Sequence, residues 1–230
     1  MKASPDLLSR RGIGADRPYL ASMGIYLFDK KVLVESLENR LQDFGRNVIP
    51  AAVGRRKVHA HVFGGYWRDI GTIRAFYDAH LDLVRPEPPF PFADPEWPVY
   101  THPRYLPGAR ISGTRFNRAI LCEGSAVMNS TVEDSIIGVR TVMHRATVRR
   151  SLLMGADAEP ADAPPGAPPV GIGEGTLIQE AIVDKNARIG RNVRIVNQDK
   201  VTDAEGTGWA IRDGIVVVTK NAVIPDGTTI

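Results

Sequence analysis

The sequence predicts an α/β region followed by an all-β region, a left-handed parallel β-helix built from hexapeptide repeats. Up to residue 85, apolar residues alternate at strand spacing or recur at helical spacing. After about residue 108, aliphatic residues recur every six positions, a period that fits neither a helix nor a simple strand. We therefore expect an α/β segment at 1–85, a Pro-rich linker at 86–107 and a β-helix at 108–230.

Composition limits the class of protein. The 230 residues are 43% hydrophobic and 24% charged, which is ordinary for a soluble globular chain. The net charge is +3 without a long block of Lys or Arg, so we expect no nucleic-acid partner. One cysteine excludes a disulfide framework. Because no signal peptide or 18-residue apolar run is found, we expect no membrane span and a cytoplasmic location.

The N-terminal segment begins with a short apolar run at residues 25–28, which predicts a buried strand. Asp29 directly after it is a suitable N-cap for a helix whose apolar positions continue to Leu41. Residues 43–53 indicate a turn and a short helix. Alternating apolar residues at 58–62 predict a second strand.

Helical spacing returns at residues 72–85, where Thr72 or Gly71 is placed to cap the helix. The linker that follows is irregular, and we expect Trp97 and Tyr100 to anchor it to the surface.

Six-residue spacing defines the β-helix. One inward side chain per short strand is expected at every sixth position. The series are Ile120, Ala126 and Val132; Ile136, Val142, Val148 and Met154; Leu177, Val183, Ile189 and Ile195; and Val218, Ile224 and Ile230. The register slips between these series, and the second slip coincides with a loop rich in Pro, Ala and Gly at 157–170. The glycine run at 171–175 falls within the repeats and therefore predicts a corner rather than a phosphate-binding loop.

The stretch "GYWRDIGT" at residues 65–72 is the strongest candidate for chemistry. It places one carboxylate, Asp69, on a turn between a predicted strand and a predicted helix. Such a carboxylate is a suitable ligand for Mg²⁺, and it is equally a suitable cap for the helix near Thr72. His144 is a separate candidate, as the general base of a hexapeptide-repeat acyltransferase, although a lone His on a coil is more often a surface residue.

Several motifs occur in an order that resembles glucose-1-phosphate adenylyltransferase (ADP-glucose pyrophosphorylase). They are "YLASMGIYLF", "DFGRNVIP", "GYWRDIGT", "FYDAHLDL", "PVYTHPRYLP", "SLLMGAD", "IVDKNARIG" and "IPDGT". The resemblance runs from about residue 18 to residue 230. It implies that residues 1–85 are the C-terminal remnant of a Rossmann-like nucleotidyltransferase domain. It also implies the conversion of ATP and glucose 1-phosphate into ADP-glucose and diphosphate, in glycogen or starch synthesis.

The resemblance assigns roles to particular residues. Asp69 corresponds to a ligand of the catalytic Mg²⁺, and Ser22 to a residue that contacts glucose 1-phosphate. Lys2 aligns with a sugar-phosphate contact, although Met1 and Ala3 depart from the family's Glu and Pro. The family's Gly-rich nucleotide loop is not found before Tyr19. We therefore expect this chain to lack adenylyltransferase activity by itself.

In the same family, the β-helix takes part in subunit contacts and in allosteric control. Lys185, Arg188 and Lys220 match positions linked to binding of anionic metabolite effectors, while a solvated charged coil is the simpler interpretation. The resemblance also implies a homo-oligomer, in the family a homotetramer, formed through the β-helix. Three classes stay open: part of the enzyme, a non-catalytic regulatory or assembly subunit of the same fold, and an acyltransferase that uses His144.

Overall fold

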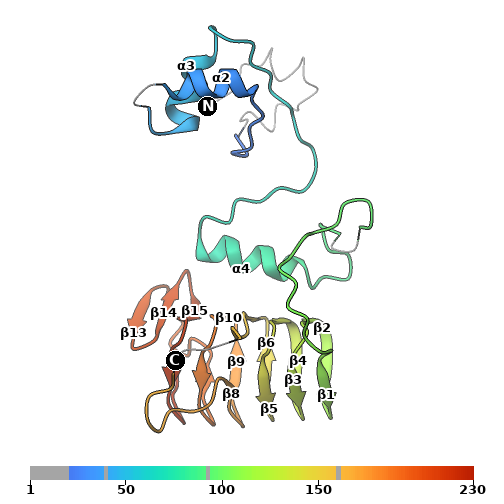
Figure 1. Ribbon diagram of the computed structural model, residues 1–230. Coiled ribbons are helices and arrows are strands. Elements are labelled where there is room, and N and C mark those ends of the chain that lie inside the picture. Colours follow the sequence, from blue (N-terminus) through green and yellow to red (C-terminus); the bar gives the residue numbers. More distant parts are fainter. Residues whose placement is uncertain (1–20, 39–40, 92–93, 159–161) are drawn as a thin grey trace. The chain divides into compact units, whose positions relative to one another are not determined.

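The computed structural model describes residues 21–38, 41–91, 94–158 and 162–230 (Figure 1). The chain divides into two compact units, Met1–Trp67 and Arg68–Ile230. The second unit therefore begins within the "GYWRDIGT" stretch and contains the helix that follows it. Within the described residues, no helix has the length and apolar character needed to cross a membrane.

The first unit contains three short helical segments, as the capping residues predict. They are α2 (Lys30–Leu37), the π-helical turn η1 (Phe44–Val48) and α3 (Ile49–Ala52). The Asp29 carboxylate accepts hydrogen bonds from the backbone N–H groups of Lys31 and Val32, at 2.9 and 3.3 Å, which confirms the predicted cap. The helix ends before Leu41, earlier than predicted.

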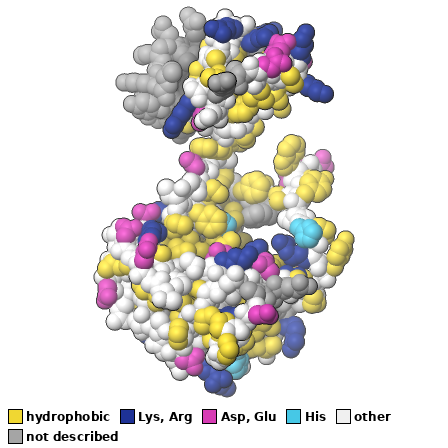
Figure 2. All heavy atoms as spheres, turned by 60° about the vertical axis from the view of Figure 1, so that its left-hand side comes forward, with side chains coloured by type: hydrophobic (Ala, Val, Ile, Leu, Met, Phe, Trp, Pro, Cys, Tyr) yellow, Lys and Arg dark blue, Asp and Glu magenta, His cyan; other side chains and the backbone are white. Residues whose placement is uncertain are grey.

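The two predicted strands of this unit are not formed. Residues 25–28 and 57–63 are outside any strand, and Ile25 is 74% exposed. A strand requires a neighbour to accept and donate its backbone hydrogen bonds, and no described residue provides one here. Hydrophobic side chains consequently gather on the surface of this unit (Figure 2).

The second unit is a parallel β-helix covered on one face by helix α4 (Ile73–Asp82). The strands are β1 (Arg110–Ser112), β2 (Arg115–Leu121), β3 (Ala126–Met128), β4 (Thr131–Ile137), β5 (Val142–His144), β6 (Thr147–Arg149), β7 (Leu152–Leu153), β8 (Gly171–Ile172), β9 (Leu177–Gln179), β10 (Ala181–Val183), β11 (Arg188–Ile189), β12 (Arg194–Ile195), β13 (Ala204–Gly206), β14 (Trp209–Arg212), β15 (Ile215–Val218) and β16 (Val223–Ile224).

Three faces form the β-helix. The first is the parallel stack β1-β3-β5-β8-β11-β16. β4 runs across the corner between the other two faces. Its first residues pair with β6 on the second face, and its last residues pair with β7 on the third. The third face continues through β7, β10 and β15, and the antiparallel strands β14 and β13 extend it.

The corners explain why a fixed period of six loses register. Successive corner residues with positive φ are Gly113, Arg118, Gly124, Asn129, Asp134 and Arg140. Their spacings are five, six, five, five and six residues. Equivalent positions are therefore 16 residues apart, as in the hydrogen bond from the Ser151 N–H to the Ser135 hydroxyl.

This spacing corrects part of the predicted inward series. Val132, Val148, Val183, Ile189, Ile195, Val218, Ile224 and Ile230 are buried as predicted. In five other places the inward residue is the next one along the chain: Leu121 rather than Ile120, Val127 rather than Ala126, Ile137 rather than Ile136, Met143 rather than Val142, and Ile178 rather than Leu177. The fully inward side chain of β7 is Leu153 rather than Met154. The predicted glycine corner is confirmed at Gly175, whose φ is 75°.

Helix α4 packs on the outside of the third face. Tyr77 and Val84 bury their side chains against a row of outward aliphatic residues from β4, β7, β10 and β15: Ile136, Leu152, Ile182 and Ile215. Phe76 and Leu81 join them, so the predicted apolar face of the helix is confirmed. The helix is thus part of the same compact unit as the β-helix.

The linker is irregular as predicted, but its two aromatic residues do not anchor it. Trp97 is 79% exposed and Tyr100 is 91% exposed, so the prediction for both was wrong. Proline removes backbone N–H donors along this segment, so fewer hydrogen bonds are available to fix it against the coils.

Candidate functional site

Asp69 lies on the exposed turn that leads into α4. Its Oδ1 accepts a hydrogen bond from the Gly71 N–H at 3.0 Å. The Thr72 hydroxyl accepts a hydrogen bond from the Ala75 N–H at 3.1 Å and is therefore the N-cap of α4. The alternative in which Asp69 caps this helix is wrong, because Thr72 already occupies that position. Within the described residues, Asp69 forms no ion pair.

The preceding residue attaches the other end of this turn to α4. Arg68 Nη1 lies 2.6 Å from Oδ2 of Asp82, a carboxylate that is 5% exposed. Arg85 Nη2 lies 2.6 Å from the other oxygen of the same carboxylate. Both oxygens of the Asp82 carboxylate are therefore paired with a guanidinium group, and such pairing is the condition for burying a carboxylate. The Asp69 turn is held at the start of α4 by Thr72 and near its end by Arg68.

Helix α4 is in turn fixed to the β-helix by two hydrogen bonds besides its apolar contacts. The Tyr77 hydroxyl donates to the Arg150 carbonyl at 2.5 Å, and Arg74 Nη2 donates to the Asp213 carbonyl at 2.5 Å. Burial raises the pKa of Tyr77 to about 12, since the phenolate would lose its water. The position of Asp69 therefore depends on the packing of the β-helix.

The donor set at this turn fits one ligand of a magnesium site, not a complete site. No group of three or more His, Cys, Asp or Glu side chains is arranged for a metal within the part of the chain that is described. Mg²⁺ commonly takes one or two protein carboxylates and completes its shell with water and substrate phosphates. An exposed Asp69 on a fixed turn satisfies the first of these requirements.

Ser22 belongs to the first compact unit, whereas Asp69 belongs to the second. Its hydroxyl is 3.1 Å from the Tyr26 hydroxyl and accepts a hydrogen bond from the Gly24 N–H at 3.2 Å. Tyr26 belongs to a small aromatic cluster with Phe28 and Phe44. Ser22 is exposed, so its hydroxyl is accessible for a sugar ligand. Lys2 lies outside the described residues.

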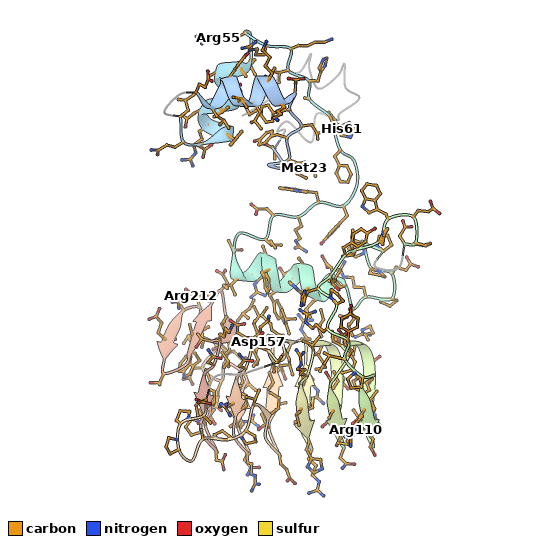
Figure 3. The ribbon with its side chains drawn as sticks, viewed as in Figure 1. Met23, Arg55, His61, Arg110, Asp157 and Arg212 are labelled. Carbon is orange, nitrogen blue, oxygen red and sulfur yellow. The ribbon has the colours of Figure 1, made fainter. Side chains whose placement is uncertain are left out.

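Lys185 and Lys220 converge on one carboxylate of the β-helix. Lys185 Nζ lies 3.3 Å from Oδ1 of Asp157, and Lys220 Nζ lies 3.2 Å from Oδ2 (Asp157 is labelled in Figure 3). The side-chain amide of Asn186 donates to Oδ2 as well, at 3.1 Å. We call these four residues the anion corner. Hydrogen bonds from Asn186, Lys220 and Lys185 lower the pKa of Asp157 to about 2.

Arg188 is the third predicted effector residue, and its described hydrogen bond is made outside the anion corner. Its Nη1 donates to the Pro168 carbonyl at 3.2 Å, in the loop between β7 and β8. The structure therefore unites two of the three predicted residues. It adds Asp157 and Asn186, which the sequence reasoning did not assign to the site.

A sequence signal for the anion corner does exist. Lys185-Asn186-Ala187 and Lys220-Asn221-Ala222 are the same tripeptide, each followed two residues later by Ile. The two Asn residues have φ of 62° and 60°, so both form the same left-handed corner. The Asn221 N–H donates to the Lys185 carbonyl at 2.9 Å, which places the two tripeptides on adjacent coils.

His144 lies on the outside of the first face. Its Nε2 is 3.2 Å from the side-chain amide of Asn129, and its Nδ1 is 3.9 Å from a carboxylate oxygen of Glu174. All three residues lie at or next to a corner on the solvent side of the coils. This placement agrees with the simpler interpretation of a surface histidine.

Comparison with known families agrees with this architecture. Residues 104–229 match the GLGC left-handed parallel beta-helix domain, and residues 9–85 match the Nucleotidyl transferase family. The first match covers more than half of the chain and confirms the predicted fold class, including its handedness. The two matches together account for both the β-helix and the Asp69 turn. The chain therefore belongs to the GLGC-like nucleotidyltransferase family.

Proposed function

We propose that this chain forms part of a glucose-1-phosphate adenylyltransferase that makes ADP-glucose for glycogen or starch synthesis. The observation that carries the proposal is the exposed Asp69 carboxylate, held on a turn that Thr72 and Arg68 fix to α4. The family match and the order of the motifs support the choice of substrates, ATP and glucose 1-phosphate.

The proposed reaction joins two anionic substrates. An oxygen of the glucose 1-phosphate phosphate group attacks the α-phosphorus of ATP, the bond from that phosphorus to the bridging oxygen breaks, and diphosphate leaves. Because both partners repel each other, positioning and neutralisation of charge contribute most of the rate enhancement. Mg²⁺ would supply that neutralisation when bound. Asp69 would hold the ion, and Ser22 would donate a hydrogen bond to the sugar.

No Gly-rich nucleotide loop is found in residues 1–18, and the proposed reaction requires such a loop to bind ATP. The same fold without catalysis, as a regulatory or assembly subunit, is the alternative. The two differ in one respect that can be measured: only the first requires the Asp69 carboxylate for turnover.

The test combines this chain with a polypeptide that carries the nucleotide loop and measures diphosphate release from ATP and glucose 1-phosphate. The chain alone should give only background. In the active combination, Asp69→Asn should lower kcat by roughly two orders of magnitude, because loss of a metal ligand removes about 3 kcal/mol of transition-state stabilisation.

Asp94→Asn is the matched control. Asp94 accepts a hydrogen bond from the Glu96 N–H at 2.9 Å and so makes the same type of turn as Asp69. It should leave kcat unchanged. If Asp69→Asn retains kcat near that of the parent, the carboxylate has only a structural role and the non-catalytic alternative is favoured.

A specific observation favours a second function for the β-helix, the binding of an anionic metabolite effector. Two ammonium groups from adjacent coils lie within 3.3 Å of the same carboxylate. A lysine ammonium is a compact charge that suits a phosphate group. We propose the anion corner as this effector site.

A further inference from the structure

The anion corner already holds an anion that belongs to the chain itself. The Asp157 carboxylate takes contacts from the Lys185 and Lys220 ammonium groups and from the Asn186 amide. A bound phosphate group uses the same kinds of donors, namely cationic side chains and N–H groups that converge on its oxygens. The carboxylate therefore stands where an external anion would have to bind.

The corner is rigid on one side. Asn186 is buried and has a φ of 62°, and its side-chain oxygen accepts a hydrogen bond from the Asp157 N–H at 2.8 Å. Its amide also donates to the Asn221 side chain of the next coil at 3.0 Å. These contacts fix the Asn186 donor whether or not the Asp157 carboxylate is present, so removal of the carboxylate leaves a preformed group of donors.

The other side of the corner is open. The side chains of Asp157, Lys185 and Lys220 are 36%, 36% and 52% exposed. Ion pairs at this exposure contribute little to stability, because water screens them and the long side chains lose conformational freedom. The carboxylate can therefore move away from the ammonium groups without unfolding the coils.

We infer that Asp157 is an internal competitor at the effector site, so that an anion binds Lys185 and Lys220 only by displacing this carboxylate. The inference rests on the proposed effector function. The competitor carries one negative charge, and a phosphate group near neutral pH carries up to two. Asp157 thus lowers the apparent affinity of every anion by the same factor, so that only anions that bind the two ammonium groups strongly, such as polyanionic phosphate compounds, occupy the site. Because its pKa is about 2, this competition persists across the physiological pH range.

The experiment measures the binding of radiolabelled inorganic phosphate to the full chain by equilibrium dialysis at constant ionic strength. Asp157→Asn should raise the affinity for phosphate by about fivefold or more, because one competing charge beside two ammonium groups is removed. Adding Lys220→Gln to Asp157→Asn should abolish that gain. Acetate in place of phosphate should gain affinity by the same factor, because the same carboxylate has to leave before either anion binds.

Asp134→Asn is the matched control. Asp134 pairs with Arg118 on a different coil, so the substitution changes the net charge by the same amount and also releases a cation. It should leave the affinity unchanged. Equal affinity of the parent chain and Asp157→Asn would overturn the inference while preserving the effector site. Absence of binding to both would overturn the effector site and the inference together.

Discussion

The two units of this chain use similar aliphatic residues with opposite results. In the first unit, Ile25 is 74% exposed and Leu27 is fully exposed. In the β-helix, Ile178 and Ile195 are completely buried. The difference is whether a neighbouring strand is present to form backbone hydrogen bonds with the apolar segment. Each coil of the β-helix is paired with the coils above and below it, whereas residues 25–28 and 57–63 have no described strand beside them.

A sequence segment therefore forms a parallel strand only when other strands are present to pair with it. The β-helix supplies that assembly from one continuous stretch of chain, since residues paired on adjacent coils are 16 positions apart in the first coils and at most 35 apart in the later ones. A Rossmann-like sheet draws its strands from distant parts of the sequence, and a few of them cannot form it. We therefore expect the β-helix to be the more stable unit and the first unit to be the less stable one.

Limited proteolysis tests this contrast with the largest expected effect. We expect cleavage first between residues 57 and 67, and a resistant fragment that begins near Arg68 and retains α4. Cleavage within the β-helix should be roughly a hundredfold slower or more, because it requires opening of the buried core. Mass spectrometry of the fragments checks this. A fragment that starts after residue 85 as the first stable product would show that α4 is not held by the β-helix.

A pair of identical substitutions measures the same contrast as a free energy. Ile178→Ala should lower the free energy of unfolding of the β-helix by about 3 kcal/mol, because it leaves a cavity in a closed core. Ile25→Ala should change it by less than about 0.5 kcal/mol, since the side chain is exposed in another unit. Denaturant unfolding followed by circular dichroism gives both values. Similar losses for the two variants would contradict the division described above.

The smallest effect concerns the contact between α4 and the β-helix. Tyr77→Phe removes the hydrogen bond to the Arg150 carbonyl and should lower the free energy of unfolding by about 1 kcal/mol at neutral pH. The folded-state pKa of Tyr77, about 12, lies above the unfolded value near 10. Its stabilising effect is therefore complete below pH 10 and decreases as the pH rises from 10 towards 12.

Tyr77→Phe should remove this alkaline component of the pH dependence, and unfolding measured at several pH values checks it. Tyr105→Phe is the control, because Tyr105 is 94% exposed. It should change neither the free energy of unfolding nor its dependence on alkaline pH. An unchanged alkaline profile in Tyr77→Phe would contradict the buried position of this hydroxyl.

The sequence predicted features that depend on local signals. Asp29 was recognised as a cap, and Thr72 as one candidate for a second cap, because an N-cap bonds to N–H groups only two or three residues away. The strand at 25–28 was predicted wrongly, because an apolar run records a preference for burial and says nothing about a neighbour. The β-helix was recognised by its period, but Val142 was assigned inward because corners are five or six residues apart, with five more frequent, rather than always six.

The candidate sites show the same limit. Asp69 was found from its turn, and only the geometry showed that Thr72, not Asp69, caps α4. Asp157 was missed because it begins a Pro/Ala/Gly-rich segment that the sequence identifies as a loop. Its two lysine partners lie 28 and 63 positions away in the chain, on coils that become neighbours only by stacking.

The loop between β7 and β8 leaves and re-enters the β-helix at one corner without disturbing the stack. Leu153 before it pairs with Ile137, and Ile172 after it pairs with Met143, both in the register of the uninterrupted coils. The length of this segment can therefore change without shifting the register in which the coils on either side are paired. Evolution, or a protein engineer, can add or remove sequence there, and whatever is added begins directly beside Asp157.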